Sequence, residues 1–303
     1  MDRALKGYAV ITTIGMLVVV IMGAIVTNTQ SADGCGTSWP LCYGHIIPQQ
    51  ANEKTWIEVS HRYVSALLGI LVVILAVWSW VRLPRARETK FLAVMSVFFI
   101  VLQGLLGGAA VKWQESSFAL ALHFGFSIIS FASVLLLAIV IFEQLHFGQP
   151  YTPKMSKGFR TNIFAISIYT YLVVYSGAFV RHSGSASGCG TSWPLCNGQW
   201  IPPIATPAGV QFIHRVAAGI VFLWILYIFI KAIPSYSHKR LLFGAVLAAF
   251  LLVSAQVAAG AVVVLSGLAL PFLLLHALFI TCLFGVLCYL FMVATRRKNH
   301  RLP

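Results

Sequence analysis

The sequence predicts an all-α membrane protein with eight transmembrane helices, arranged as two tandem four-helix bundles with a parallel pseudo-twofold repeat. Three observations predict this fold. The 303 residues are 59% hydrophobic and only 9% charged, whereas soluble domains have about 25% charged residues. The apolar runs reach the length of about 20 residues that a helix needs to cross a bilayer. Finally, a loop with two cysteines occurs twice in nearly identical form.

The duplicated loop reads GCGTSWPLCYG at 34–44 and GCGTSWPLCNG at 188–198, so the copies lie 154 residues apart. Beyond the loops the spacing is 153 residues, which relates His61 to His214 and His123 to His276. A fixed period of this kind identifies a repeated unit. Each unit has an even number of spans, so both enter the membrane from the same side, as in parallel repeats. We expect the two units at 1–150 and 151–303.

The apolar runs set the expected order of elements. Lipid offers no partners for backbone polar groups, so each run must be a helix. The first run could be a cleaved signal peptide, but its counterpart at 163–180 lies in the middle of the chain, where no signal peptide works. The basic loop at 143–160 is the expected seam between the units. The predicted spans are about 8–28, 59–81, 91–111, 118–142, 160–181, 210–233, 241–265 and 270–294.

The formal net charge is +14, and the basic residues that cause it are concentrated on one side of the membrane. All basic residues fall on one side of the predicted spans except Lys54, Arg62, Lys112, Arg181 and Arg215. The positive-inside rule then predicts a multi-pass protein of the cell membrane, with both termini cytoplasmic and both cysteine loops outside. The cationic side suits the anionic inner leaflet of a lipid bilayer. No nucleic-acid partner is needed to explain the charge.

The loop cysteines favour a disulfide within each loop, Cys35–Cys42 and Cys189–Cys196. An outward-facing loop permits oxidation, and its Gly and Pro residues permit the tight turn that such a bridge needs. Four cysteines allow three connectivities, so bridges between the units stay open. Each pair is either a structural staple or a thiol pair that exchanges electrons. Zinc is disfavoured because no third ligand repeats.

Histidines carry the functional signal. His61, His123, His214 and His276 lie in or at the rim of apolar spans, whereas His45, His146, His182, His238 and His300 are expected in loops or the tail. A lone intramembrane histidine is more often a packing residue, but a duplicated pair at matched depth favours ligands. Zinc wants three or four protein ligands, whereas a porphyrin iron needs only two axial ones. We therefore predict one bis-histidine haem site in each unit.

Three residues near the histidines are candidates for further roles. Arg62 and Arg215 each follow a predicted ligand, where they would bind haem propionates or snorkel to headgroups. Glu58 lies three residues before His61, within roughly 60° of the same helix face, and its counterpart is Gln211. Glu58 is either a hydrated rim residue or an acid that accepts protons beside a haem. The second interpretation makes the N-terminal unit reactive and the C-terminal unit a relay.

Together, the duplicated four-span unit, the cysteine pairs, the four histidines and Glu58-x-x-His61 resemble haem A synthase of the bacterial type over nearly the whole chain. The resemblance implies an oxidoreductase that converts haem O to haem A for terminal oxidases, oxidising the C8 methyl group to a formyl group. It implies a haem O synthase and a membrane electron acceptor as partners. The implied site residues are His61 and His123 for the substrate haem, His214 and His276 for haem B, Glu58 as the catalytic carboxylate, and Cys35 and Cys42 as a pair that matters for activity.

The expected mechanism depends on the two ligands of the N-terminal unit. If His61 and His123 both stay bound, the iron has no open position for O2. We then expect electron withdrawal from the methyl carbon, two additions of water with Glu58 taking protons, and loss of water from the diol. Three rivals stay open: a di-haem electron carrier, a thiol–disulfide membrane oxidoreductase, and a transporter.

Overall fold

The computed structural model describes residues 2–49, 51–83, 87–113 and 117–296. Within these ranges the chain forms eight α-helices, each long and apolar enough to cross a membrane. The prediction of an all-α membrane protein with eight spans is confirmed. The helices are α1 (Asp2–Asn28), α2 (Glu53–Arg82), α3 (Arg87–Lys112), α4 (Ser117–Phe147), α5 (Lys157–His182), α6 (Pro207–Tyr236), α7 (Arg240–Leu265) and α8 (Leu270–Thr295), with a 3-10 helix η1 (Ser185–Ser187) after α5.

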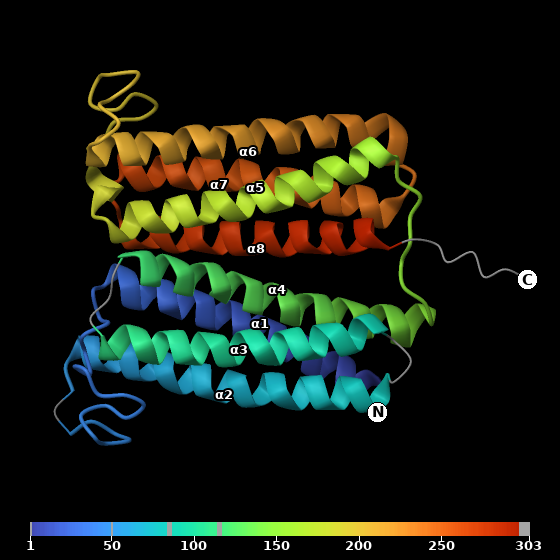
Figure 1. Ribbon diagram of the computed structural model, residues 1–303, viewed down its shortest axis with the longest axis horizontal. Helices are drawn as coiled ribbons and strands as arrows, with labels where there is room; N and C mark the ends of the chain where they lie inside the picture. Colours follow the sequence, from blue (N-terminus) through green and yellow to red (C-terminus); the bar gives the residue numbers. More distant parts are fainter. Residues whose placement is uncertain (1, 50, 84–86, 114–116, 297–303) are drawn as a thin grey trace, which may run out of the picture.

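The helices pack as two groups of four (Figure 1). In the first group α2 and α4 each contact both α1 and α3, and in the second group α6 and α8 each contact both α5 and α7. Each group has its own apolar core, with Leu75 and Leu137 fully buried in the first and Leu283 fully buried in the second. Each group is therefore a four-helix bundle with short or looped connections.

The two bundles meet where α4 contacts α5 and α8, and where α1 contacts α8. Two hydrogen bonds across this interface join residues that are counterparts in the repeat. Arg181 Nη2 donates to the Thr27 carbonyl at 3.1 Å, and Arg296 Nη1 donates to Glu143 Oε1 at 3.1 Å. A residue meets its own counterpart only near a rotation axis. Because these pairs lie toward opposite ends of the helices, they support a pseudo-twofold axis that runs along the helices.

Arg296, directly after α8, clamps the two bundles together. Its guanidinium donates to Glu88 at the start of α3, to Glu143 near the end of α4 and to the carbonyl of Tyr151 in the connecting segment, and only 3% of the side chain is exposed. Burial alone would lower the pKa of Arg296, but the two carboxylates outweigh burial and raise it. Removing this guanidinium would leave the Glu143 carboxylate buried without its partner.

Several helices are longer than the sequence predicts. α4 continues to Phe147 and α5 begins at Lys157, so the connection between the bundles is 148–156 rather than 143–160. His146 and His182 therefore lie in helices and not in loops, which corrects that prediction. His300 and four of the predicted inner basic residues lie outside the described residues, namely Arg85, Arg297, Lys298 and Arg301.

Polar caps extend α2 and α6 toward the cysteine loops. Asn52 Oδ1 accepts from the Thr55 amide at 2.9 Å, and Thr206 caps α6 in the same way ahead of Pro207. His61 consequently lies about 12 Å along α2, whereas the predicted span begins only two residues before it. Both cysteine loops lie at one end of the molecule, and the start of α1 and the end of α8 lie at the other (Figure 1).

Candidate functional site

The first candidate site lies in the N-terminal bundle, between His61 of α2 and His123 of α4. His61 lies near enough to His123 for a charge on the His61 ring to act on the His123 ring. Each lies against a glycine of the preceding helix. A Cβ built on Gly23 of α1 would lie 3.3 Å from His61 Nε2, and one built on Gly107 of α3 would lie 3.6 Å from His123 Cε1. All four helices of the bundle therefore meet at this site.

The second candidate site repeats this arrangement in the C-terminal bundle. His276 of α8 lies near enough to His214 of α6 for a charge on the His276 ring to act on the His214 ring. A Cβ on Gly177 of α5 would lie 2.8 Å from His214 Cε1, and one on Gly260 of α7 would lie 3.0 Å from His276 Cε1. The glycines on α5 and α7 thus contact the imidazoles more tightly than those on α1 and α3.

Polar side chains orient three of the four imidazoles. Gln256 Nε2 lies 3.1 Å from His276 Nε2. When the Gln103 amide is oriented so that both its atoms find complementary partners, its nitrogen donates to His123 Nδ1 at 3.1 Å. Ser176 Oγ lies 2.8 Å from His214 Nδ1. Each of these side chains lies on the same helix as the glycine that contacts the imidazole: α3 for His123, α5 for His214 and α7 for His276.

The residues of both sites fit a haem. Both histidines of each site lie against a glycine of a neighbouring helix, so the backbone of all four helices comes close to the two rings that would hold the iron. In the described residues, the buried Nδ1 of His276 has no hydrogen-bond partner, and a bound group would satisfy this orphaned polar atom. The same residues contain no group of three or more His, Cys, Asp or Glu able to hold a metal ion. Two imidazoles per site suit an iron whose remaining ligands come from a macrocycle.

Both cysteine loops are closed by internal disulfides, Cys35–Cys42 and Cys189–Cys196. Next to each bridge the backbone turns back on itself, with Cys42 and His45 bonded reciprocally at 3.1 and 3.0 Å. Gly44 in this turn has a φ of 79°, which glycine adopts without steric cost. The second loop has the same reciprocal bonds and a glycine at the same position.

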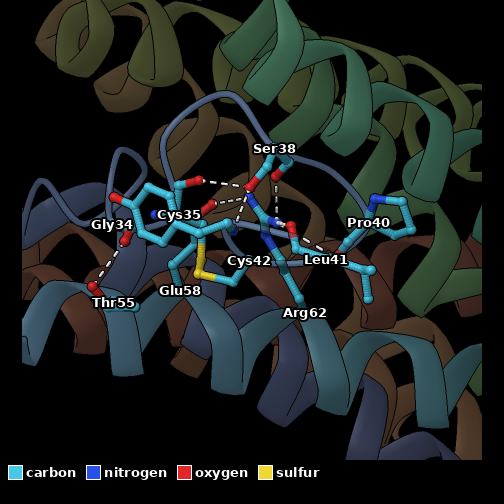
Figure 2. A network of polar contacts seen from close by, with 10 residues as sticks. Gly34, Cys35, Ser38, Pro40, Leu41, Cys42, Thr55, Glu58 and Arg62 are labelled. Carbon is cyan, nitrogen blue, oxygen red and sulfur yellow. Dashed lines mark hydrogen bonds and ion pairs between the residues drawn. A yellow bond between two sulfur atoms is a disulfide. The ribbon is translucent and has the colours of Figure 1, made fainter. Parts of the chain in front are cut away.

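Glu58 ties the first loop to α2 (Figure 2). Its Oε2 accepts from the Cys35 amide at 2.7 Å, and its Oε1 forms a short ion pair with Arg62. The residue is only 3% exposed, so it is buried and not hydrated at the rim. Both carboxylate oxygens are already engaged, and protonation of Glu58 would therefore weaken its hold on the loop.

Arg62 and Arg215 bind the cysteine loops. The sequence predicts contacts with haem propionates or lipid headgroups instead. Arg62 Nη1 donates to the carbonyls of Ser38 at 2.8 Å and Leu41 at 3.1 Å (Figure 2). Arg215 makes the equivalent bonds in the second loop, at 3.1 and 3.2 Å. Each arginine therefore fastens a cysteine loop to the helix that carries the first histidine of the pair.

Gln211 repeats the loop contact of Glu58 with a neutral group. Its Oε1 accepts from the Cys189 amide at 2.8 Å, and its Nε2 donates to the Ala186 carbonyl at 2.8 Å. Gln211 is also buried, at 4% exposed. The two halves therefore attach their loops alike, and the charge at this position is what differs.

Sequence reasoning does not identify three features of these sites. The pair Gly23 and Gly177 could have been found, because the two are separated by the repeat spacing of 154. Ser176 carries no such signal, since its counterpart is Met22. His182, which is predicted in a loop, is the last residue of α5 and therefore lies at the same end of the bundles as the cysteine loops.

Comparison with known proteins assigns the chain to a family. Residues 6–288 match the family described as cytochrome oxidase assembly protein. The heme A synthase of Shouchella clausii is 46% identical over 300 residues, which cover 98% of this chain and 99% of that protein. The chain belongs to this family. The family's heme A synthases from Geobacillus kaustophilus and Bacillus licheniformis are 47% and 46% identical, over 99% of this chain and over 94% and 99% of theirs. The resemblance that the sequence predicts is thereby confirmed.

Proposed function

We propose that the protein is a haem A synthase, an oxidoreductase that oxidises the C8 methyl group of haem O to the formyl group of haem A for terminal oxidases. The names of relatives aligned over nearly the whole chain support this proposal. The observation that carries it is the histidine pair flanked by two glycines in each of two matching bundles.

In this proposal the two units have different tasks. His61 and His123 hold the substrate haem O in the catalytic unit, residues 1–150, and His214 and His276 hold a resident haem B in the relay unit, residues 151–303. When bound, the haem B supplies one-electron redox chemistry. A haem O synthase supplies the substrate, and a membrane acceptor removes the electrons. Both termini face the cytoplasm and both cysteine loops face outside, as the distribution of basic residues supports.

Glu58 is the proposed catalytic carboxylate. With water as the oxygen source, one methyl group and one water give one formyl group, four protons and four electrons. The protons need a base near the methyl group, and Glu58 is a buried carboxylate one helical turn from His61. A proton on Glu58 would weaken its bonds to the Cys35 amide and to Arg62. Proton uptake would therefore loosen the loop that closes this end of the bundle.

Identification of the bound haems tests the proposal. The protein is produced in cells that make haem O, and the extracted haems are identified by mass. We expect haem A and haem B in the wild type, loss of haem A with retention of haem B in His61→Ala and His123→Ala, and loss of haem B in His214→Ala and His276→Ala. Haem O that binds but is never converted would identify a di-haem electron carrier instead.

The origin of the formyl oxygen tests the role of Glu58 as a base for water. In a short reaction with ¹⁸O-labelled water, we expect the label in the formyl group before exchange. Label from ¹⁸O2 would reject the addition of water, while leaving the haem A synthase assignment intact.

A further inference from the structure

The histidines on α2 and α6 occupy equivalent positions but have different surroundings. His214 Nδ1 lies 2.8 Å from Ser176 Oγ of α5. The equivalent residue on α1 is Met22, and a methionine sulfur is only a weak acceptor. Within the described part of the chain, the His61 ring has no hydrogen bond. The histidines on α4 and α8, by contrast, both have a glutamine partner, at Nδ1 of His123 and at Nε2 of His276.

The serine also determines which nitrogen of His214 carries the proton. Ser176 Oγ donates its hydrogen to the Val173 carbonyl at 2.7 Å, so toward the imidazole it can only accept. His214 Nδ1 must therefore carry a proton and donate it to Ser176, which leaves a lone pair on Nε2 for a metal. Such a partner fixes the tautomer and orientation of a ligating histidine and raises its basicity.

The glycines reinforce the difference. A Cβ on Gly177 would lie 2.8 Å from the His214 ring, whereas a Cβ on Gly23 would lie 3.3 Å from the His61 ring. α5 therefore restrains His214 by both a hydrogen bond and close packing. α1 provides neither the hydrogen bond nor equally close packing for His61.

We propose that the Met22/Ser176 position determines how readily each site exchanges its haem, with His61 as the ligand that releases and His214 as the ligand that retains. This inference rests on the proposed function, which needs a site that takes up haem O and discharges haem A beside a site that keeps haem B. The chemical logic is that an imidazole without a partner on its second nitrogen is the weaker and less well oriented ligand. The N-terminal site thus exchanges haem because a hydrogen bond is missing, and no extra element is needed to open it.

Haem transfer to apomyoglobin tests this proposal without any conversion of haem O. Purified full-length protein is loaded with haem B at both sites, and the gain of myoglobin absorbance is followed. We expect two phases for the wild type, separated by at least about 10-fold in rate. The variant His61→Ala assigns the fast phase, because it should remove that phase alone. Equal rates from the two sites in the wild type would overturn the proposal.

Two exchanges at the critical position sharpen the test. We expect Ser176→Ala to accelerate the slow phase about 10–100-fold and Ser176→Thr, which keeps a hydroxyl, to restore the slow rate. Met22→Ser should slow the fast phase by a similar factor, with Met22→Ala as its control. A slow phase that Ser176→Ala leaves unchanged would reject the inference even if Met22→Ser fails to fold. Failure of the proposed function would instead appear as missing haem A, while these rates stay measurable.

Discussion

The two bundles attach their cysteine loops by the same bond but with groups of different charge. Glu58 accepts from the Cys35 amide at 2.7 Å, and Gln211 accepts from the Cys189 amide at 2.8 Å. The C-terminal bundle shows that a neutral amide is sufficient to hold the loop. A buried carboxylate costs more free energy than a buried amide, so loop attachment alone does not explain Glu58. This comparison points to chemistry in the N-terminal bundle.

The largest expected effect on haem A formation comes from replacing Glu58 by glutamine, the residue that the C-terminal bundle has at the equivalent position. Glu58→Gln should lower haem A formation about 100-fold or more, as for the loss of a general base. The loop should stay in place, because an amide oxygen can still accept from Cys35. Haem A per protein and total haem content are measured in parallel. Unchanged haem A formation would reduce Glu58 to a loop anchor.

The reciprocal change provides the matched control. Gln211→Glu places a carboxylate beside the equivalent backbone amide of the C-terminal bundle and beside Arg215, which is the counterpart of Arg62. We expect haem A formation within about 2-fold of wild type, since the proposed base already lies in the other bundle. A large loss here would show that a carboxylate at the second loop disturbs the protein independently of the proposed base.

A second prediction concerns the stability that the contacts of Arg296 between the two bundles provide. Arg296→Met should lower the free energy of unfolding by about 3 kcal/mol, because Glu143 would stay buried without its partner. The control is Arg82→Met, whose ion pair with Asp2 is exposed on both sides, and it should cost much less because solvent screens exposed pairs. Thermal unfolding in detergent measures both. Equal losses would show that the Arg296 clamp adds no more than a surface pair.

The smallest effect in this series compares the glycines. Gly177→Ala places a methyl group 2.8 Å from the His214 ring, and overpacking of this kind costs about 1–3 kcal/mol. Gly107→Ala meets the His123 ring at 3.6 Å, an ordinary contact, and should be neutral. We expect reduced haem B occupancy in the first variant only, measured by pyridine haemochrome. Full occupancy in Gly177→Ala would mean that the imidazole can move aside freely.

Local patterns identified the helices and the ligand candidates because each signal lies within one stretch of chain. Lipid accepts only long apolar helices, so the spans are readable from composition. The repeat then paired His61 with His214 and His123 with His276 without any coordinates. Helix ends were less accurate, since the cap at Asn52 and the extension of α4 depend on polar residues outside the apolar runs.

The sequence by itself determined the membrane class, the duplication, the histidine pairs and the family, because these depend on composition and spacing along one chain. Only the tertiary structure decided which group faces each histidine and what holds each loop. Ser176 reaches His214 across 38 residues, and Glu58 reaches the Cys35 amide across 23. Such partners come from helix rotation and packing between segments, and no periodicity within either segment specifies them.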